Sequence, residues 1–226
     1  MKRVILVLPA LLLMMWVSPI SLHAQNGRDI LLKSKAKFES LDDFSANFKY
    51  KLSNPALNTQ PVEQSGTVQY MKGGSFVLKL DDMQIFCDKQ TIWQYNTSTQ
   101  PREVTIMEYD EEEVLDITEV FKVYEDASEA QVQGSEKIHG QDCFKIYVAV
   151  KDPQADYNQA VVWVNKKTMM PEKASLVERT QSMTTFEFSN YELNQDLTVS
   201  DFRMDIESEK AELAQQSIEL NVYDER

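Results

Sequence analysis

Residue types that commonly catalyse reactions are scarce in this sequence. It contains two histidines and two cysteines, and one of the histidines, His23, lies in the amino-terminal leader described below. The other, His139, lies in the turn motif KIHGQD, where a histidine is usually exposed to solvent. The sequence also lacks a Gly-rich phosphate loop, an HExxH helix and a complete nucleophile elbow. We therefore expect neither enzymatic activity nor a bound cofactor.

Metal-binding patterns are absent too. The densest group of carboxylates is EYDEEE at residues 108–113. It has neither the ligand spacing nor the glycine turn of a calcium-binding EF-hand loop. We interpret it as the solvated start of a helix, where acidic side chains complement the helix dipole, and we expect no metal site.

Basic residues are fewer than acidic ones. The chain has 23 Lys and Arg against 36 Asp and Glu, a formal net charge of −13. Phosphate backbones and anionic membrane surfaces would repel such a protein. We therefore expect a soluble monomer that does not bind nucleic acid.

The only long apolar run lies at the amino terminus. Lys2 and Arg3 precede an apolar stretch at residues 4–17, and the motif SLHA ends at Ala24. The stretch is shorter than the roughly 20 residues of a membrane span, and its order of parts is that of a cleaved signal peptide. We expect residues 1–24 to be removed and residues 25–226 to form a single exported domain in the periplasm.

The two cysteines, Cys87 and Cys143, would then lie in an oxidising compartment. Such a pair is a candidate disulfide. Their separation in space cannot be read from the sequence, so free thiols are the open alternative.

Most of the chain alternates apolar and polar residues with a period of two. After an amphipathic helix predicted at residues 26–41, the stretch DFSANFKYKL begins a series of such segments, separated by short turn motifs. This pattern is typical of antiparallel strands. The sequence predicts a mainly β (α+β) fold of at least nine strands. Such a sheet must curve into an open, incomplete barrel in order to bury its apolar face.

One central segment breaks the alternation. Between residues 110 and 125 apolar side chains recur at helical spacing. We expect this helix to cross the open face of the sheet as a lid, through Val114, Ile117, Val120 and Phe121.

Aromatic residues are numerous on the predicted strands. Taken singly, each is best explained as a core residue. Taken together, one curved sheet with few helices has too little side-chain volume to fill its hollow, which favours an apolar ligand cavity. The predicted cavity residues are Phe48, Tyr50, Tyr70, Phe76, Leu78, Trp93, Tyr95, Phe186 and Phe188.

These segments, in this order, resemble the periplasmic outer-membrane lipoprotein carrier family, LolA. The amino-terminal helix leads into a strand matching F-x-A-x-F, then a hairpin with a leading glycine, then a strand of the W-x-Y type. The residues that match the family patterns are Phe44, Ala46, Phe48, Gly66, Phe76, Asp88, Trp93, Tyr95, Phe186, Phe188, Asn190, Leu193, Leu197 and Phe202.

The resemblance implies an open barrel of about eleven strands whose cavity takes the acyl chains of lipoproteins. It implies lipidated proteins as cargo, an inner-membrane lipoprotein-releasing transporter as donor and an outer-membrane receptor as acceptor. The family's lid-holding arginine corresponds here to Lys72. A periplasmic lipid- or lipopeptide-binding sensor of the same fold is the alternative, because one fold serves several functions.

Overall fold

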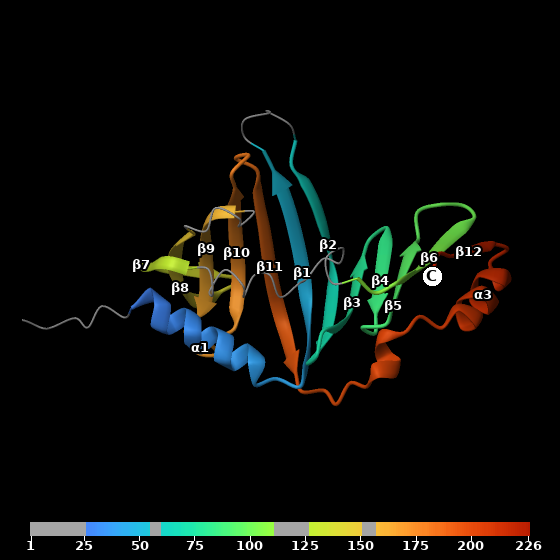
Figure 1. Cartoon of the computed structure of the whole chain (residues 1–226), viewed down its shortest axis with the longest axis horizontal. Helices are drawn as coiled ribbons and strands as arrows, with labels where there is room; N and C mark the ends of the chain where they lie inside the picture. Colours follow the sequence, from blue (N-terminus) through green and yellow to red (C-terminus); the bar gives the residue numbers. More distant parts are fainter. Residues whose placement is uncertain (1–25, 55–59, 111–126, 151–156) are drawn as a thin grey trace, which may run out of the picture.

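The computed structural model describes residues 26–54, 60–110, 127–150 and 157–226. In this part of the chain, twelve strands form one curved sheet (Figure 1). The sheet does not close, because β7 and β12 lie at its two edges and do not pair with each other. The strands are β1 (Asp43–Ser53), β2 (Val62–Met71), β3 (Ser75–Leu80), β4 (Met83–Cys87), β5 (Thr91–Asn96), β6 (Arg102–Glu108), β7 (Ala127–Ile138), β8 (Gln141–Val150), β9 (Tyr157–Asn165), β10 (Pro171–Glu178), β11 (Met183–Leu193) and β12 (Leu220–Asp224).

The chain starts in the middle of the sheet and fills it from both directions. From β1 it steps strand by strand to β6, and from the opposite edge it steps from β7 back to β11, which pairs with β1. All these pairs are antiparallel. The last strand, β12, joins the far edge by pairing in parallel with β6.

Cross-strand partners lie on the same face of a sheet, so the register can be followed across the molecule. The face on which helix α1 (Gly27–Glu39) packs is called the α1 face, and the opposite one the outer face. Two rows of partners cross the α1 face, one from β6 to β1 and one from β1 to β7, and together they form one apolar row because all members belong to the same apolar cluster. The first part consists of Met107, Ile92, Cys87, Phe76, Tyr70 and Phe44, and the second of Tyr50, Phe186, Ala174, Val162, Ile146 and Val132.

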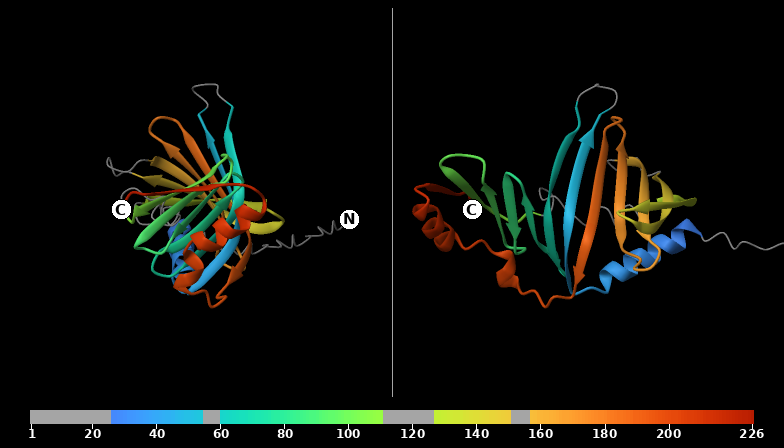
Figure 2. Two further views of the ribbon diagram at one scale, coloured as in Figure 1. Left: turned by 90° about the vertical axis from the view of Figure 1, so that its right-hand side faces the viewer. Right: turned by 180° about the vertical axis from the view of Figure 1, so that it is seen from behind.

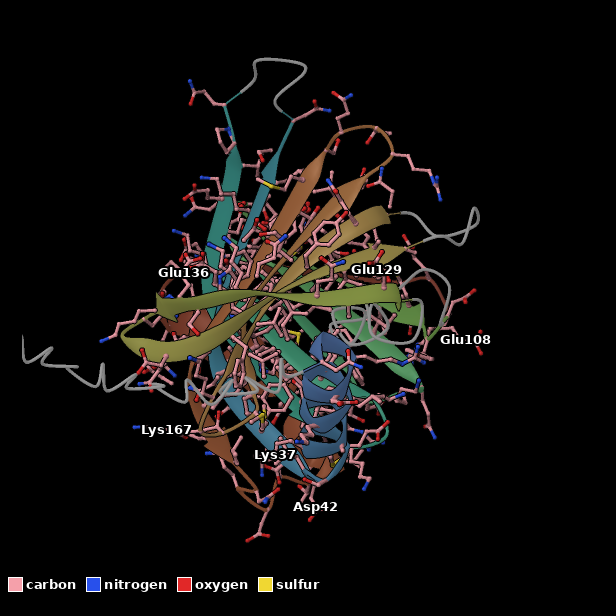
Figure 3. The ribbon with its side chains drawn as sticks, turned by 90° about the vertical axis from the view of Figure 1, so that its left-hand side faces the viewer. Lys37, Asp42, Glu108, Glu129, Glu136 and Lys167 are labelled. Carbon is pink, nitrogen blue, oxygen red and sulfur yellow. The ribbon has the colours of Figure 1, made fainter. Side chains whose placement is uncertain are left out.

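Helix α1 begins where Asn26 caps it, since the side-chain oxygen of Asn26 accepts a hydrogen bond from the backbone N–H of Arg28. The helix buries Ile30, Leu31 and Phe38 against the sheet. Its start is close-packed on β7, because a β-carbon on Gly27 would lie 2.8 Å from the backbone of Ala130. Figure 3 shows α1 beside the crossing strands β7 and β8.

The carboxyl-terminal segment packs at the other end of the sheet. It consists of the short helix η2 (Val199–Phe202), the helix α3 (Ile206–Gln215) and β12. Figure 2 shows α1 and α3 at opposite ends of the molecule. Phe202 is fully buried, so this segment is an integral part of the fold.

The predicted mainly-β fold, an open curved sheet covered by helices, is confirmed. Two details differ from the expectation: the described residues form twelve strands rather than about eleven, and the last pairing is parallel. Within these residues, no helix combines the length and apolar character needed to cross a membrane.

Candidate functional site

The α1 face carries a continuous cluster of aromatic side chains at its centre. Phe48 on β1 pairs with Phe188 on β11, and Tyr50 pairs with Phe186. Ring centroids are 5.6 Å apart for Phe48 and Phe188, and 5.7 Å apart for Tyr50 and Phe186. These distances are typical of favourable aromatic contacts, so β1 and β11 present one apolar surface.

A second aromatic group joins this surface to helix α1. The ring of Tyr70 on β2 lies 5.4 Å from Phe38 of the helix and 5.5 Å from Phe44 of β1. Phe76 and Leu78 follow on β3 and are almost completely buried. Seven of the nine predicted cavity residues therefore lie on one face: Phe48, Tyr50, Tyr70, Phe76, Leu78, Phe186 and Phe188.

Tyr50 and Tyr70 are only partly buried, whereas the phenylalanines are buried. Burial raises the pKa of the Tyr50 hydroxyl, and the negative charge of Glu178 raises it further. Tyr50 is therefore a neutral side chain at ordinary pH, as an apolar surface requires.

Trp93 and Tyr95 lie on the outer face, away from the other seven residues. They belong to a separate cluster with Val104 and Ile106 of β6 and Met204 of the carboxyl-terminal segment. The Tyr95 hydroxyl donates a 2.6 Å hydrogen bond to the carboxylate of Glu209 in α3. Burial and this carboxylate raise the pKa of Tyr95 well above its usual value.

The predicted place of Trp93 and Tyr95 is thus corrected. Both share a face, as their spacing indicates, but β5 is turned so that Ile92 is the residue on the α1 face. Alternation defines which residues share a face but not which face lies inward.

Further apolar side chains of the α1 face come from β8 and β9. Ile146, Val148, Val162 and Val164 are fully buried there. They are not among the predicted cavity residues, although the alternation in CFKIYVAV marks the first two. On β9, QAVVWVN is apolar at every position from Ala160 to Val164, so the sequence does not show which of these side chains lie on the α1 face.

The candidate disulfide is not formed. Cys87 and Cys143 are both free and buried. Cys87 on β4 packs on the α1 face, whereas Cys143 on β8 packs with Ile138 and Trp163 in a cluster of the outer face. Six strands separate β4 from β8 in the sheet, while a disulfide needs Cα atoms within about 7 Å of each other.

Lys72 lies in the turn between β2 and β3, and its side chain is exposed. Its backbone N–H donates to the carbonyl of Asp42 at 2.8 Å, which anchors the turn to the segment between α1 and β1. The predicted lid residues Val114, Ile117, Val120 and Phe121 lie outside the described residues.

Most of the chain matches one known protein family. Residues 39–205 match the family described as outer membrane lipoprotein carrier protein LolA. No curated protein matches the chain by sequence.

Solved structures of similar shape share little sequence with this chain. LprF from Mycobacterium bovis is 13% identical, with 76% of this chain and 95% of that chain covered and a TM-score of 0.51. The lipoprotein LppX from Mycobacterium tuberculosis is 14% identical, with 76% and 97% covered and a TM-score of 0.46. A LolA superfamily protein from Nitrosomonas europaea is 13% identical, with 80% and 98% covered and a TM-score of 0.41. The likeness to LprF concerns the fold.

Proposed function

This chain belongs to the outer membrane lipoprotein carrier family, LolA, and on that premise we propose that it carries the acyl chains of lipidated proteins across the periplasm. The donor would be an inner-membrane lipoprotein-releasing transporter and the acceptor an outer-membrane receptor. The acyl chains would bind against the α1 face. No enzymatic step is part of this proposal.

The observation that supports it is the apolar row that crosses the sheet on the α1 face, centred on the aromatic side chains of β1 and β11. An acyl chain has no polar group to pair, so it needs a surface of this chemistry. Burying one methylene contributes roughly 0.8 kcal/mol, so a chain of about 16 carbons gains on the order of 12 kcal/mol. A host of this kind offsets the cost of moving a lipidated protein through water.

Release requires that the free protein also has a stable state. If apolar side chains of the protein itself cover the α1 face when no cargo is bound, they compete with the cargo and lower its net affinity. The predicted lid residues, Val114, Ile117, Val120 and Phe121, would have this role, with Lys72 holding the lid. The site residues in this proposal are the seven that lie on the α1 face.

The test compares the same substitution on the two faces of the sheet. Tyr50 lies on the α1 face and Tyr147 on the outer face, and both are partly buried. We expect Tyr50→Asp to weaken binding of a fluorescent fatty acid by at least about tenfold, because a carboxylate in an apolar site costs several kcal/mol. Tyr147→Asp should leave binding unchanged. Circular dichroism would establish that both variants are folded.

Equal effects of the two substitutions, or none, would contradict the proposed site. Native mass spectrometry of protein recovered from the periplasm then identifies the cargo. Bound acylated proteins are the expected result, whereas bound free lipid alone would favour the alternative of a lipid-binding or sensor protein.

A further inference from the structure

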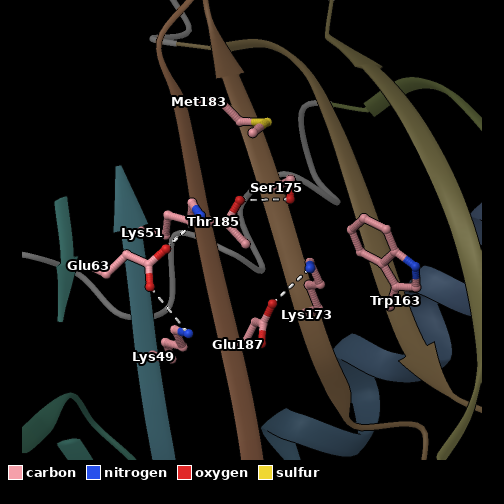
Figure 4. A pocket seen from close by; sticks show the side chains of 9 residues that line it. All are labelled: Lys49, Lys51, Glu63, Trp163, Lys173, Ser175, Met183, Thr185 and Glu187. Carbon is pink, nitrogen blue, oxygen red and sulfur yellow. Dashed lines mark hydrogen bonds and ion pairs between the residues drawn. The ribbon is translucent and has the colours of Figure 1, made fainter. Parts of the chain in front are cut away.

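The outer face of the sheet holds a pocket that has no part in the proposed acyl site. It has a volume of 330 Å³ and is lined by side chains of β1, β2, β9, β10 and β11 (Figure 4). On β1, β9, β10 and β11 these side chains alternate with residues of the α1-face cluster, so they point to the opposite face. Glu63 on β2 lies opposite Lys51 of β1 and therefore shares its face. Pockets that bind small molecules are of this size or larger.

Ammonium groups outnumber carboxylates in this pocket. Lys49 and Lys51 share one carboxylate, that of Glu63, at 3.4 Å and 2.6 Å. Lys173 pairs with Glu187 at 2.7 Å. Three ammonium groups therefore face two carboxylates, and this local excess of positive charge stands out in a chain with a net charge of −13.

The two carboxylates are already neutralised. Both oxygens of Glu63 contact a lysine. One oxygen of Glu187 accepts from Lys173, and the other lies 3.4 Å from Nε2 of His139 at the tip of the hairpin between β7 and β8. Burial alone would raise the pKa of Glu187, but the hydrogen bond and charge of Lys173, with the charges of His139 and Lys49, lower it. Each ammonium group has three N–H donors, so donors remain for a further anion.

A pair of buried hydroxyls adds another donor. Ser175 and Thr185 lie opposite each other on β10 and β11, with their oxygens 3.0 Å apart. Both residues are buried and both line the pocket. One hydroxyl hydrogen is used within the pair, and the other has no acceptor among the residues that the structure describes. A buried donor of this kind favours a ligand that brings an acceptor oxygen.

Apolar surface completes the lining. Trp163 is 7% exposed, and its ring lies 5.3 Å from the ammonium of Lys173. Its indole N–H donates to Glu136, and Met183 of β11 also lines the pocket. The volume exceeds that of a bare inorganic ion, so there is room for an organic part of the ligand against Trp163.

We propose that this outer-face pocket binds a small organic oxyanion, either a carboxylate or a phosphate ester. The oxyanion accepts from Lys49, Lys173 and the hydroxyl pair, and the organic part packs against Trp163. This site is separate from the acyl site, and its test does not depend on lipid binding.

The experiment follows the indole N–H signal of Trp163 by nuclear magnetic resonance, with Trp163→Phe used to assign it. The probes are glycerol 3-phosphate and benzoate, and their uncharged counterparts are glycerol and benzyl alcohol. We expect both anions to shift the signal and the uncharged compounds to have little effect. Tighter binding of glycerol 3-phosphate would indicate a phosphate ester such as a lipid headgroup, and tighter binding of benzoate would indicate a free organic acid.

Two variants locate the binding. Lys173→Gln should raise the dissociation constant of the anions by about tenfold, which is the usual effect of losing a hydrogen bond to a charged group. Thr185→Val keeps the side-chain shape and every charge, and it should raise the dissociation constant a few-fold. This variant also tests the site if Lys173→Gln does not fold. The matched control is Lys79→Gln, because Lys79 lies on the outer face of β3 but does not line this pocket.

Three results would overturn the proposal. The anions could leave the Trp163 signal unchanged up to about 50 mM, a concentration at which even weak ligands bind. The uncharged compounds could shift it as strongly as the anions do. Finally, Lys79→Gln could weaken binding as much as Lys173→Gln, which would indicate attraction to the whole face rather than a site.

Discussion

Asp88 and Arg203, 115 residues apart in the sequence, form an ion pair with 2.7 Å between Oδ2 and Nε. The Asp88 side chain is only 3% exposed. Its other oxygen accepts from the backbone N–H groups of Gln90 and Thr91, at 3.0 Å and 2.9 Å. One carboxylate therefore shapes the turn between β4 and β5 and also holds the segment that follows η2.

Replacing this carboxylate should destabilise the protein. Asp88→Asn removes the negative charge that pairs with Arg203, and it weakens the hydrogen bonds that the side chain accepts from the backbone N–H groups of Gln90 and Thr91. We expect a loss of about 1–3 kcal/mol in the free energy of unfolding, measured by urea denaturation. Asp224→Asn is the control, because the exposed pair of Asp224 with Arg226 should contribute little. Equal losses in the two variants would refute the role given to Asp88.

The contribution of Asp88 should depend on pH. Burial alone would raise its pKa, but the hydrogen bonds from Thr91, Arg203 and Gln90 lower it below its ordinary value. A carboxyl with a lowered folded-state pKa stabilises the protein above its unfolded-state pKa of about 3.9, and the effect is lost as the pH falls through the folded-state value. The stability difference between wild type and Asp88→Asn should therefore shrink between pH 7 and pH 3. Urea midpoints at several pH values measure it, and a constant difference would contradict this linkage.

Gly66 should tolerate no side chain. A β-carbon at this position would lie 1.8 Å from the carbonyl oxygen of Lys79 on the neighbouring strand. We expect Gly66→Ala to cost about 3 kcal/mol or more in stability, since the backbones must separate. Gly73→Ala is the control: its φ of 103° is unfavourable for alanine, but its β-carbon would meet nothing within 4 Å, so the loss should be near 1 kcal/mol. Similar unfolding midpoints for both variants would contradict the predicted clash between a side chain at position 66 and the backbone of Lys79.

Tyr95→Phe should loosen the carboxyl-terminal helix without affecting acyl binding. The substitution removes the 2.6 Å hydrogen bond to Glu209, which is worth about 1–2 kcal/mol. Faster hydrogen exchange in α3 would report the change, while fatty-acid binding should stay at the wild-type value. Tyr223→Phe serves as control because Tyr223 is 47% exposed. Loss of fatty-acid binding in Tyr95→Phe would instead mean that Tyr95 contributes to the acyl site.

Both thiols should be free and poorly reactive in the folded protein. Burial, with the nearby charge of Glu172, raises the pKa of Cys143 to about 11, and burial also raises the pKa of Cys87. The thiolate fraction of Cys143 at pH 8 is therefore on the order of 0.1%, and the thiolate is the reactive form. A thiol reagent should detect two thiols after unfolding without reductant and almost none before it. Detecting no thiol after unfolding would mean that a disulfide exists, and Cys87→Ala should lower the count to one.

Much of the fold could be predicted from alternation alone. Phe44, Phe48 and Tyr50 share a face because every second side chain of a strand does so, and the structure places them together on the α1 face. Motif residues also have physical reasons: Gly66 allows two strands to approach closely, and Asp88 organises a turn. Arg203, the partner of Asp88, has no local pattern that indicates its role.

The sequence by itself determined the period of each element and the residues that share a face, because these depend on near neighbours along the backbone, and its composition determined the acidic net charge. Only the tertiary structure decided the orientation of each strand. It turned Trp93 and Tyr95 toward α3, kept Cys87 and Cys143 apart and gathered Lys49, Lys173 and Trp163 around one pocket. The physical reason is that a strand pattern is unchanged when its two faces are exchanged. Contacts between distant segments, here with α1 and with α3, select which face is buried inside.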